Sequence, residues 1–346
     1  MIRSLDKQQA AESSPAQLHE AFLARACKAA SDPLRLTILR ALRAESFGVL
    51  ELCHILDMAQ SKLSHHLKVL SGAGLVATRR DGNSIFYRRP LLAEDTPLAG
   101  FTQALFASVD LIPLDSAILE RMDSIRDERA QSSLEFFAKN ADKFKENQAL
   151  ITENSQYVAN IRELVKFARL PGSATALEIG PGEGDFLVEL AIQFNEVSAV
   201  DNSAHMLAIA KQKAEQAHLG NIRFILGEPA DALEQRITAD LLVCNMVLHH
   251  IASPSELFRQ AAQLLNEGGY MLVAELCPHD QSWVRDSCGD IWLGFEPQEL
   301  EHWAAAAALR SRQNLFLSLR NGFQVQLHLF QKTLGATANS QSLNDE

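Results

Sequence analysis

The sequence predicts a chain of two folded parts: a small helical domain with a β-hairpin, then an α/β domain with a mostly parallel sheet. Three observations predict this multidomain α and α/β fold class. Apolar residues recur at helical spacing from Leu34 to Leu70, and a hairpin pattern follows them. A short apolar strand at 175–179 runs into a glycine-rich loop. Apolar residues alternate on both sides of Asn321-Gly322, which is typical of an antiparallel hairpin.

The composition is that of a globular protein without a membrane span. Of the 346 residues, 47% are hydrophobic and 22% are charged, and no apolar run approaches the ~20 residues that cross a bilayer. We see no apolar leader followed by a small-residue cleavage site. Five scattered cysteines without a C-x-x-C pair indicate a reducing compartment, so we expect a cytoplasmic protein.

The charge is unevenly distributed along the chain. The net charge is −11, yet residues 20–90 hold eleven lysines and arginines against six acidic residues. A basic segment on an acidic chain favours a module that binds a polyanion. Charge alone does not decide between that interpretation and chance, so the motifs must.

Three helices are expected in the basic segment. Asp32-Pro33 begins the first, with aspartate as the N-cap and proline in the first turn. A second short helix covers 49–56, and residues 57–59 form the turn after it. The third helix ends at a pair of glycines and has an apolar stripe of Leu63, Leu67 and Leu70.

The opposite face of the third helix is polar, and its side chains fit beside base edges in the major groove. A hairpin turning at Asp81-Gly82-Asn83 follows, with arginines placed to meet phosphates, Arg89 among them. A small helical subdomain with a solvated face is the alternative interpretation. The residues expected at DNA are Gln60, Ser61, Lys62, Ser64, His65, Lys68, Arg79, Arg80 and Arg88.

Residues 20–90 resemble the ArsR/SmtB family of winged-helix repressors. The resemblance implies a homodimer on a near-palindromic double-stranded DNA operator, with repression released by a ligand. Cysteines that bind metal in some members would align with Gly48 and Leu50, so metal sensing is not expected, and Cys53 is interpreted as a buried small residue. The motifs that carry the resemblance are Ala30-Ser31-Asp32-Pro33-Leu34-Arg35-Leu36, Gln60 to Leu70 and Ala73-Gly74-Leu75-Val76.

The connecting segment, from Leu91 to about Glu146, is mostly helical in pattern. It is broken at Pro97 and Pro113. We favour a dimer contact for its amphipathic helix, although the helix could instead pack on its own domain. Phe136-Phe137 and Phe144 begin a stretch that could cover the mouth of the next domain. The apolar stripe of this helix comprises Leu114, Ile118, Leu119, Met122 and Ile125.

The C-terminal half has the pattern of a nucleoside-binding βαβ unit. The strand at 175–179 leads into a loop with three glycines, then a helix, then a strand that ends at Asp201. The glycines allow close approach of a ligand, and the acid can accept hydrogen bonds from ribose hydroxyls. Further strands are expected at 224–226, 240–244 and 270–274. A terminal hairpin is not the usual nicotinamide-binding arrangement.

Residues 150–333 resemble the class I S-adenosylmethionine-dependent methyltransferases, which implies a mostly parallel seven-stranded, Rossmann-like sheet. The motifs are Leu177-Glu178-Ile179-Gly180-Pro181-Gly182-Glu183-Gly184, Val200-Asp201-Asn202-Ser203, Met206-Leu207, Leu248-His249-His250-Ile251 and Leu264-Leu265-Asn266-Glu267-Gly268-Gly269. By position, the glycines would line the amino-acid end of S-adenosylmethionine, Asp201 would hold the ribose and Met206 would contact the adenine. Glu228 would lie beside the adenine amino group, where the family more often has aspartate. The implied cofactor-binding residues are Glu178, Gly180, Gly182, Gly184, Asp201, Asn202, Met206, Glu228 and Asn245.

The catalytic residues are not evident from the sequence. His249, His250 and Asn245 are weak candidates beside the transfer centre. A loop from Cys277 to Phe295 resembles the acceptor side of methyltransferases fused to ArsR-type modules, and its Trp283, Trp292 and Phe295 either face the sulfonium or belong to the core. Cys277, His279 and Cys288 lack a fourth ligand at fitting spacing, so no metal is expected.

The sequence thus predicts four segments: a winged helix at 15–92, a helical linker or dimerisation segment at 93–150, a methyltransferase-like domain at 151–334 and a disordered tail at 335–346. We expect a DNA-binding transcription regulator, of the repressor type, whose C-terminal domain binds S-adenosylmethionine or S-adenosylhomocysteine. The fusion resembles regulators of the methionine cycle that respond to S-adenosylhomocysteine. The alternative is an active methyltransferase for an unknown small molecule, with arsenic a disfavoured acceptor.

Overall fold

The computed structural model of the protein describes residues 15–81, 84–92, 98–152 and 154–333. The chain divides into two compact units, Met1–Arg126 and Asp127–Glu346. Helix α7 (Ser116–Ile151) crosses this division, so its residues belong to both units. The segment boundaries that the sequence suggested near residues 92 and 150 stay a prediction, and the expected tail lies outside the described residues.

The N-terminal unit combines helices with a small antiparallel sheet. Before α7 its elements are α2 (Pro15–Ala30), α3 (Pro33–Ala41), β1 (Phe47–Gly48), α4 (Val49–Leu56), α5 (Gln60–Gly72), β2 (Ala77–Asp81), β3 (Ser84–Arg88) and α6 (Ala99–Asp110). The strands lie in the order β1-β3-β2. Asp32 begins α3 as expected, because its side chain accepts a hydrogen bond from the Arg35 backbone N–H at 3.0 Å.

The turn between α4 and α5 is tight. Asp57 adopts a left-handed conformation with φ of 50°, and the Met58 N–H donates to the Cys53 carbonyl at 2.9 Å, which closes the end of α4. Helix α5 then starts at Gln60 and turns its apolar stripe into the core. Its buried side chains are Leu63, Leu67 and Leu70, all at 1% exposure or less. The helix-turn-helix expected from the sequence is therefore present.

The C-terminal unit is an α/β domain. After α7 its elements are η1 (Asn154–Gln156), α8 (Val158–Ala168), β4 (Thr175–Ile179), α9 (Asp185–Gln193), β5 (Glu196–Asp201), α10 (Ala204–Gln216), β6 (Ile222–Leu226), α11 (Pro229–Glu234), β7 (Ala239–Asn245), η2 (Leu248–His250), α12 (Pro254–Leu264), β8 (Leu265–Leu276), α13 (Trp283–Cys288), α14 (Pro297–Ala306), β9 (Leu309–Ser318) and β10 (Gln324–Lys332). The sheet order is β6-β5-β4-β7-β8-β10-β9.

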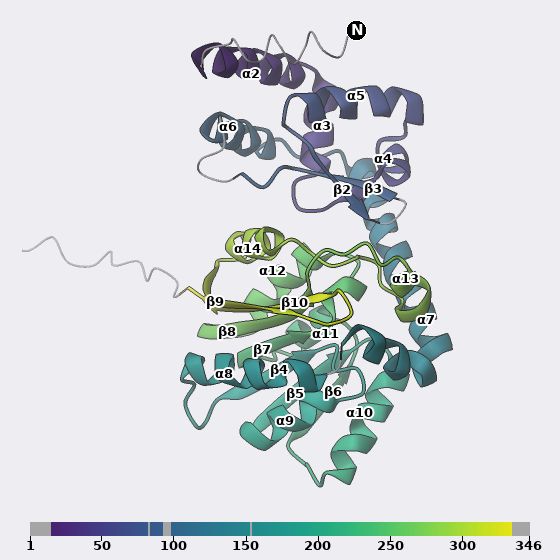
Figure 1. Cartoon of the computed structure of the whole chain (residues 1–346), viewed down its shortest axis with the longest axis vertical. Helices are drawn as coiled ribbons and strands as arrows, with labels where there is room; N and C mark the ends of the chain where they lie inside the picture. The colour runs from purple at the N-terminus through teal and green to yellow at the C-terminus, as the bar shows by residue number, and fades with distance from the viewer. Residues whose placement is uncertain (1–14, 82–83, 93–97, 153, 334–346) are drawn as a thin grey trace, which may run out of the picture. The chain divides into compact units, whose positions relative to one another are not determined.

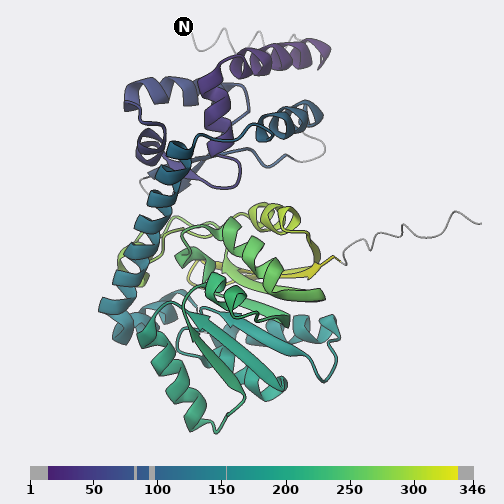
Figure 2. The same cartoon turned by 180° about the vertical axis from the view of Figure 1, so that it is seen from behind.

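This sheet is parallel except at one end. Strands β6, β5, β4, β7 and β8 pair in parallel, whereas β10 runs antiparallel to both β8 and β9. Helices α8, α9 and α10 cover one face, and α11, α12 and α14 cover the other (Figures 1 and 2). The predicted fold class, a mostly parallel seven-stranded sheet closed by an antiparallel hairpin, is confirmed.

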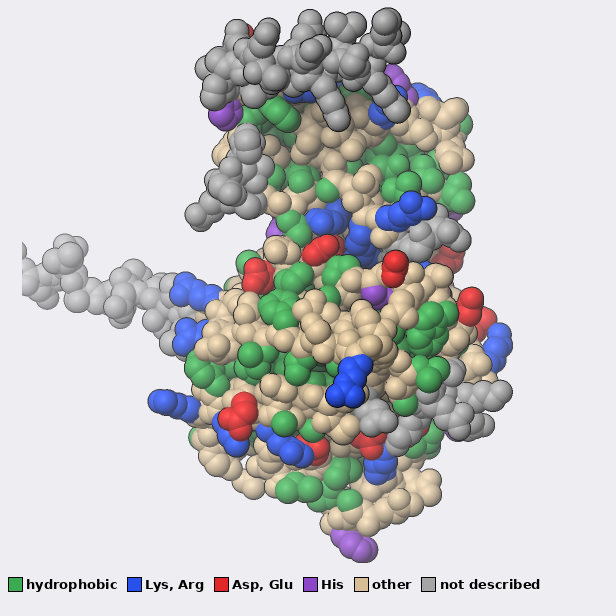
Figure 3. Space-filling view, viewed as in Figure 1, with side chains coloured by type: hydrophobic (Ala, Val, Ile, Leu, Met, Phe, Trp, Pro, Cys, Tyr) green, Lys and Arg blue, Asp and Glu red, His purple; other side chains and the backbone are tan. Residues whose placement is uncertain are grey.

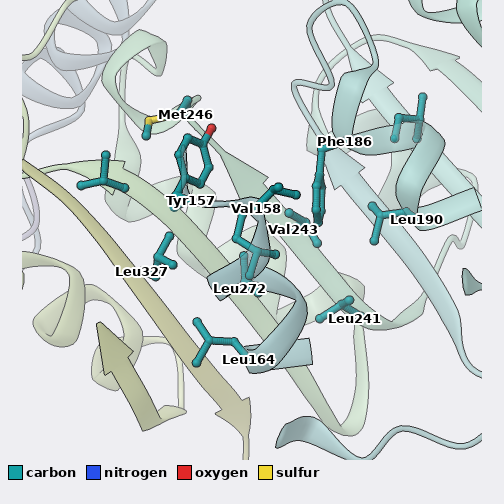
Figure 4. Close-up of a cluster of buried hydrophobic side chains, with 14 of the residues drawn as sticks. Tyr157, Val158, Leu164, Phe186, Leu190, Leu241, Val243, Met246, Leu272 and Leu327 are labelled. Atoms are coloured by element: carbon teal, nitrogen blue, oxygen red, sulfur yellow. The ribbon is translucent and has the colours of Figure 1, made fainter. Parts of the chain in front are cut away.

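A continuous hydrophobic core lies between the sheet and the helices α8 and α9. Figure 4 draws part of it, with Leu164 of α8, Phe186 and Leu190 of α9, and Leu241 and Val243 of β7. Leu241 and Val243 are fully buried. This packing fixes the carboxyl ends of the parallel strands, where ligands bind in open α/β sheets.

The terminal hairpin differs from the simple alternation that the sequence suggested. In β10 the side chains on both faces are buried, including Gln326 and His328 as well as Val325 and Leu327. The strand lies between β8 and β9, and Phe258 of α12 contacts its second face, so both faces are covered. The edge strand β9 is less buried than the sequence predicted. The alternating pattern predicted that Leu315 would be buried, but its side chain is 37% exposed.

Helix α7 resolves part of the question about the connecting segment. Met122 and Ile125 are buried in the core of the N-terminal unit, and the Arg121 Nε–H donates to the Ile55 carbonyl at 2.7 Å. This part of the stripe therefore packs on its own domain and not against a second copy of the chain. Leu119 of the same stripe is 45% exposed, and a dimer contact there stays a prediction.

Among the residues that the structure describes, no helix is both long enough and apolar enough to cross a bilayer. On the face of the C-terminal unit drawn in Figure 3, hydrophobic side chains lie in separate groups among charged and polar ones.

Candidate functional site

The polar face of α5 is as open as the sequence predicted. All six of the side chains expected there at DNA are exposed, while the leucines between them are buried. A helix that presents such a face can enter a major groove while its apolar stripe holds it to the domain. The exposed side chains are Gln60, Ser61, Lys62, Ser64, His65 and Lys68.

The hairpin β2–β3 carries the three arginines that the sequence predicts at DNA, Arg79, Arg80 and Arg88. Arg80 is exposed, and Arg79 and Arg88 are partly exposed, with Arg79 opposite Phe86 and Arg80 opposite Ile85 in the strand register. The side chains at the hairpin turn lie outside the described residues.

Arg89 was expected to meet phosphate, and this expectation is wrong. Its guanidinium donates two hydrogen bonds to the Asp110 carboxylate, at 2.6 and 3.0 Å, and a third to the Leu39 carbonyl at 2.8 Å. It also lies 4.5 Å from the centre of the Phe106 ring. Arg89 therefore ties the end of the wing to α6 within the N-terminal unit.

The glycine loop between β4 and α9 is built for close approach. Gly180, Gly182 and Gly184 all have positive φ, of 64°, 55° and 83°. A Cβ on Gly180 would lie 2.3 Å from a Val247 methyl, so a larger residue cannot occupy this position without moving the start of the next loop. The Gly180 N–H donates to the Val200 carbonyl at 2.8 Å, which holds the loop beside the end of β5.

Two carboxyl groups face this loop from neighbouring strands. Glu178 of β4 is 1% exposed, and burial, with the nearby charge of Asp201, raises its pKa to about 8. Burial also raises the pKa of Asp201 to about 6, although backbone N–H groups of Ser203 and Gly182 donate to it and lower the pKa in part. A ligand that brings hydrogen-bond donors or positive charge would stabilise the ionised form of both carboxyl groups.

The remaining predicted ligand contacts lie along the same edge of the sheet. Met206 of α10 is buried, and its terminal methyl lies 3.9 Å from the position of a Cβ on Gly182. Asn202 is exposed next to Asp201. Glu228 is exposed after β6, but it also caps α11, since its side chain and that of Asp231 form a capping box.

Asn245 ends β7, and a residue that sequence reasoning missed holds it. The Tyr157 hydroxyl donates a hydrogen bond to Asn245 Oδ1 at 3.0 Å, and the tyrosine is 3% exposed. Tyr157 precedes α8 and belongs to the same core as Phe186 and Met246 (Figure 4). No local pattern marks it, because a tyrosine before a helix is an ordinary core residue.

Phe136 and Phe137 of α7 pack on the C-terminal unit near the predicted ligand contacts. Both contact Met206, and the Phe137 ring centre lies 5.0 Å from that of His250. Phe136 also covers Gly289, where a Cβ would lie 2.3 Å from its ring. This agrees with the predicted covering role for the pair; the side chain of Phe144 lies outside the described residues.

His249 and His250 follow β7 on η2 and are both buried. His249 Nδ1 lies 2.6 Å from Glu275 Oε1, and its Nε2 lies 4.0 Å from Asp290 Oδ1. Burial alone would lower the pKa of His249, but the carboxylates of Glu275 and Asp290 raise it to about 9. Burial and the neighbouring His249 lower the pKa of His250 well below its usual range. The two candidate bases therefore have opposite charge preferences.

The loop from Cys277 to Phe295 contributes more to the core than to an open acceptor surface. Trp292 and Phe295 are buried, and the Trp292 indole donates to the Ile251 carbonyl at 2.8 Å, so the core interpretation fits them. Trp283 is half-buried, and its indole donates to the Gln281 side chain. Within the described part of the chain, the Cys277, His279 and Cys288 set does not form a metal-ligating group.

Comparison with known families identifies both parts. A family model described as "Methyltransferase domain" matches residues 123–321, more than half of the chain. The chain belongs to this methyltransferase family. A second model, described as "Bacterial regulatory protein, arsR family", matches residues 32–78, so the chain joins an ArsR-family helix-turn-helix to a class I methyltransferase domain.

Curated methyltransferases are similar to about two fifths of this chain. The chain is 23% identical over 145 residues to an uncharacterised methyltransferase, YcgJ, of Bacillus subtilis, covering 42% of this chain and 55% of that protein. It is 24% identical over 147 residues to a ubiquinone biosynthesis O-methyltransferase of Coxiella burnetii, covering 39% and 62%. The chain thus spans little more than half the length of these two curated relatives. A crystal structure of an O-methyltransferase family protein from Burkholderia thailandensis is similar over 97% of this chain and 99% of that one, with 18% identity and a TM-score of 0.47.

Proposed function

We propose that this protein is a DNA-binding transcription regulator whose methyltransferase-like domain binds S-adenosylmethionine or S-adenosylhomocysteine as an effector. The observation that carries the proposal is the occurrence, on one chain, of an exposed polar α5 face and a glycine loop flanked by the buried carboxyl group of Glu178 and the half-buried one of Asp201. We propose a repressor that acts in the cytoplasm as a homodimer on an operator.

The DNA-binding part of the proposal rests on α5 and the wing. Ser64 and His65 would read base edges, and Lys68 and Arg80 would contact phosphates, because short polar side chains and cations divide these tasks in major-groove recognition. Gly48 and Leu50 stand at the positions of the family's metal-binding cysteines, and neither side chain has an atom that binds a metal, so we expect no metal sensor at these positions. The signal would then have to come from the other domain.

The effector part rests on the glycine loop and its acids. The ribose hydroxyls would donate to Asp201, the ligand's α-amino group would approach Glu178, and Met206 would contact the adenine. The ribose hydroxyls of such a nucleoside would supply hydrogen-bond donors to Asp201, and its ammonium group would supply a positive charge beside Glu178. Binding that is tighter in one conformation of the dimer than in the other would change operator affinity.

Two sets of variants test the proposal. Asp201→Ala should weaken nucleoside binding by about 1–3 kcal/mol through lost hydrogen bonds to a charged group, and DNA binding should persist without a ligand response. Glu196→Ala, at the exposed start of the same strand, is the matched control. Ser64→Ala with His65→Ala should abolish specific DNA binding and leave the nucleoside affinity intact, with Ser71→Ala, exposed on the same helix, as its control.

The readouts are calorimetry with both nucleosides and gel shifts on the DNA upstream of the protein's own gene. An unchanged ligand response in Asp201→Ala would rule out the sensor mechanism. Absence of any shift, with or without either nucleoside, would rule out the regulator on that DNA.

We keep active methyl transfer as the second candidate function. It is favoured by the Tyr157–Asn245 pair at the strand end, because methyl transfer depends on in-line positioning more than on a dedicated base. Incubation with labelled S-adenosylmethionine and a cell metabolite extract tests it. A labelled product that disappears in Asp201→Ala supports activity, and no labelled product counts against it.

A further inference from the structure

We propose that His249, His250 and Asp290 form a binding site for one divalent transition-metal ion of the zinc class. The sequence predicts no metal site, because Cys277, His279 and Cys288 lack a fourth ligand at fitting spacing, and no local pattern links Asp290 to His249 and His250. The structure brings one possible donor atom of each residue within 4.8 Å of the others, and all three residues are buried. This is independent of the proposed regulator function.

The spacing of the donor atoms is close to what such an ion needs. His249 Nε2 and Asp290 Oδ1 are 4.0 Å apart, and His250 Nδ1 and Asp290 Oδ1 are 3.9 Å apart. A tetrahedral ion with bonds of about 2.0–2.2 Å holds its ligand atoms about 3.3–3.6 Å from one another. A contraction of about half an ångström would bring these two distances into that range, and the donor nitrogens of the two histidines, which lie within 4.8 Å of each other, would also have to approach.

Glu275 supplies the support that metal-bound histidines usually have. Its carboxylate lies 2.6 Å from His249 Nδ1, so this nitrogen would keep its proton, and Nε2, which lies 4.0 Å from Asp290 Oδ1, would exchange its proton for the metal ion. Glu275 is itself held in place, because it accepts hydrogen bonds from the backbone N–H groups of His249 and Leu276. The first ligand is therefore oriented before an ion arrives.

The backbone fixes the other two ligands in register. The Ile291 N–H donates to the His249 carbonyl at 2.8 Å, and the Trp292 N–H donates to the same oxygen at 3.2 Å, so the segment with Asp290 is tied to η2. His250 Nδ1 lies 3.3 Å from the Gly289 carbonyl, a weak contact that binding of an ion would replace.

The donor set decides the class of ion. Two imidazole nitrogens and one carboxylate oxygen suit zinc and neighbouring first-row divalent ions, whereas magnesium and calcium prefer all-oxygen sites. Because the three ligands are buried, the ion would fasten the loop after β8 to the end of β7. A water molecule would fill its fourth position.

The experiment uses the full chain, stripped with a chelator and then titrated with Co²⁺, whose visible absorption reports its ligand geometry. The same protein, loaded with Zn²⁺ and desalted, is analysed for metal content by plasma mass spectrometry. We expect about one tightly held equivalent, an absorption band that saturates with it, and a higher Tm with Zn²⁺ than with chelator. A wild-type protein with no band and no retained zinc would overturn the proposal.

Asp290→Asn and His249→Gln should each lose the band and weaken zinc binding by at least about tenfold, and Glu275→Gln should weaken it by about 10- to 100-fold. Asp286→Asn, at an exposed position of α13 in the same loop, is the matched control and should bind as the wild type does. Equal zinc retention in Asp290→Asn and wild type would assign the metal to other histidines or cysteines and overturn the site. The wild-type cobalt spectrum decides even where a ligand variant fails to fold.

Discussion

The Tyr157 hydroxyl and Asn245 Oδ1 are joined by a 3.0 Å hydrogen bond at the carboxyl end of β7. The tyrosine ring is anchored in the core of the C-terminal unit, so only its hydroxyl reaches the strand end. The Asn245 amide is thereby held with its oxygen towards Tyr157 and its nitrogen elsewhere. This pair orients a side chain that the proposed nucleoside site uses.

Tyr157→Phe should therefore weaken the binding of S-adenosylhomocysteine without unfolding the domain. One neutral hydrogen bond contributes about 0.5–1.5 kcal/mol, which corresponds to about a two- to tenfold loss of affinity. Isothermal calorimetry measures it, and Tyr270→Phe, a half-buried tyrosine on β8, is the matched control. Equal affinities in wild type and Tyr157→Phe would mean that Asn245 needs no such support.

Nucleoside affinity should depend on pH through Asp201. Burial raises the pKa of Asp201 to about 6 in the ligand-free protein, and the ribose hydroxyls are expected to donate to its ionised form. Affinity should then be full above about pH 6 and fall by up to about tenfold per pH unit below it, as the carboxylate takes up a proton. Calorimetry from pH 5 to 7 tests this in a Glu178→Gln background, which removes the other nearby titration. Asp201→Asn should bind weakly with no such slope.

The ligand-free protein should lose stability between about pH 4.5 and pH 8, because Glu178 ionises in the unfolded chain at a lower pH than in the folded one. Its folded-state pKa is about 8 against an ordinary value of 4.5, so the folded chain holds an extra proton between these values, and the free energy of unfolding falls as pH rises through that window. Glu178→Gln keeps the shape and cannot ionise. Relative to wild type, it should gain about 1–3 kcal/mol between pH 5 and pH 8 in urea unfolding. A constant difference across that range would contradict the buried carboxyl.

Local sequence patterns were sufficient to predict most helices and strands, the helix-turn-helix and the glycine loop. The leucine stripe of α5 and its exposed polar face follow from helical periodicity alone. The glycine loop follows from residue chemistry, since only glycine fits the positive φ and the 2.3 Å approach at Gly180. These features depend on neighbours within a few residues, which a single sequence displays directly.

Features that depend on distant contacts were not predictable. The alternation in β10 suggested one buried face, but α12 buries the other as well, and no signal within β10 records that helix. The sequence does not distinguish Arg89 from the neighbouring arginines, because its partner Asp110 lies on α6, distant along the chain. Tyr157 with Asn245, and His249 with Asp290, likewise meet only through tertiary packing.

The final prediction concerns α7, which supplies Met122 and Ile125 to the N-terminal core and Phe136 and Phe137 to the surface around Met206. If ligand binding biases this helix, interrupting it should uncouple the two activities. Glu128→Pro, at an exposed position, removes a backbone hydrogen bond and breaks the helix locally at a cost of about 3 kcal/mol, and Glu128→Ala is its control. We expect Glu128→Pro to bind both nucleoside and operator with affinities within about threefold of those of Glu128→Ala. The effect of nucleoside on operator affinity, typically 1–3 kcal/mol in coupled sites, should disappear.

Anisotropy titrations of labelled operator with and without S-adenosylhomocysteine measure this effect. A response of Glu128→Pro equal to that of Glu128→Ala would show that the coupling does not need a continuous α7.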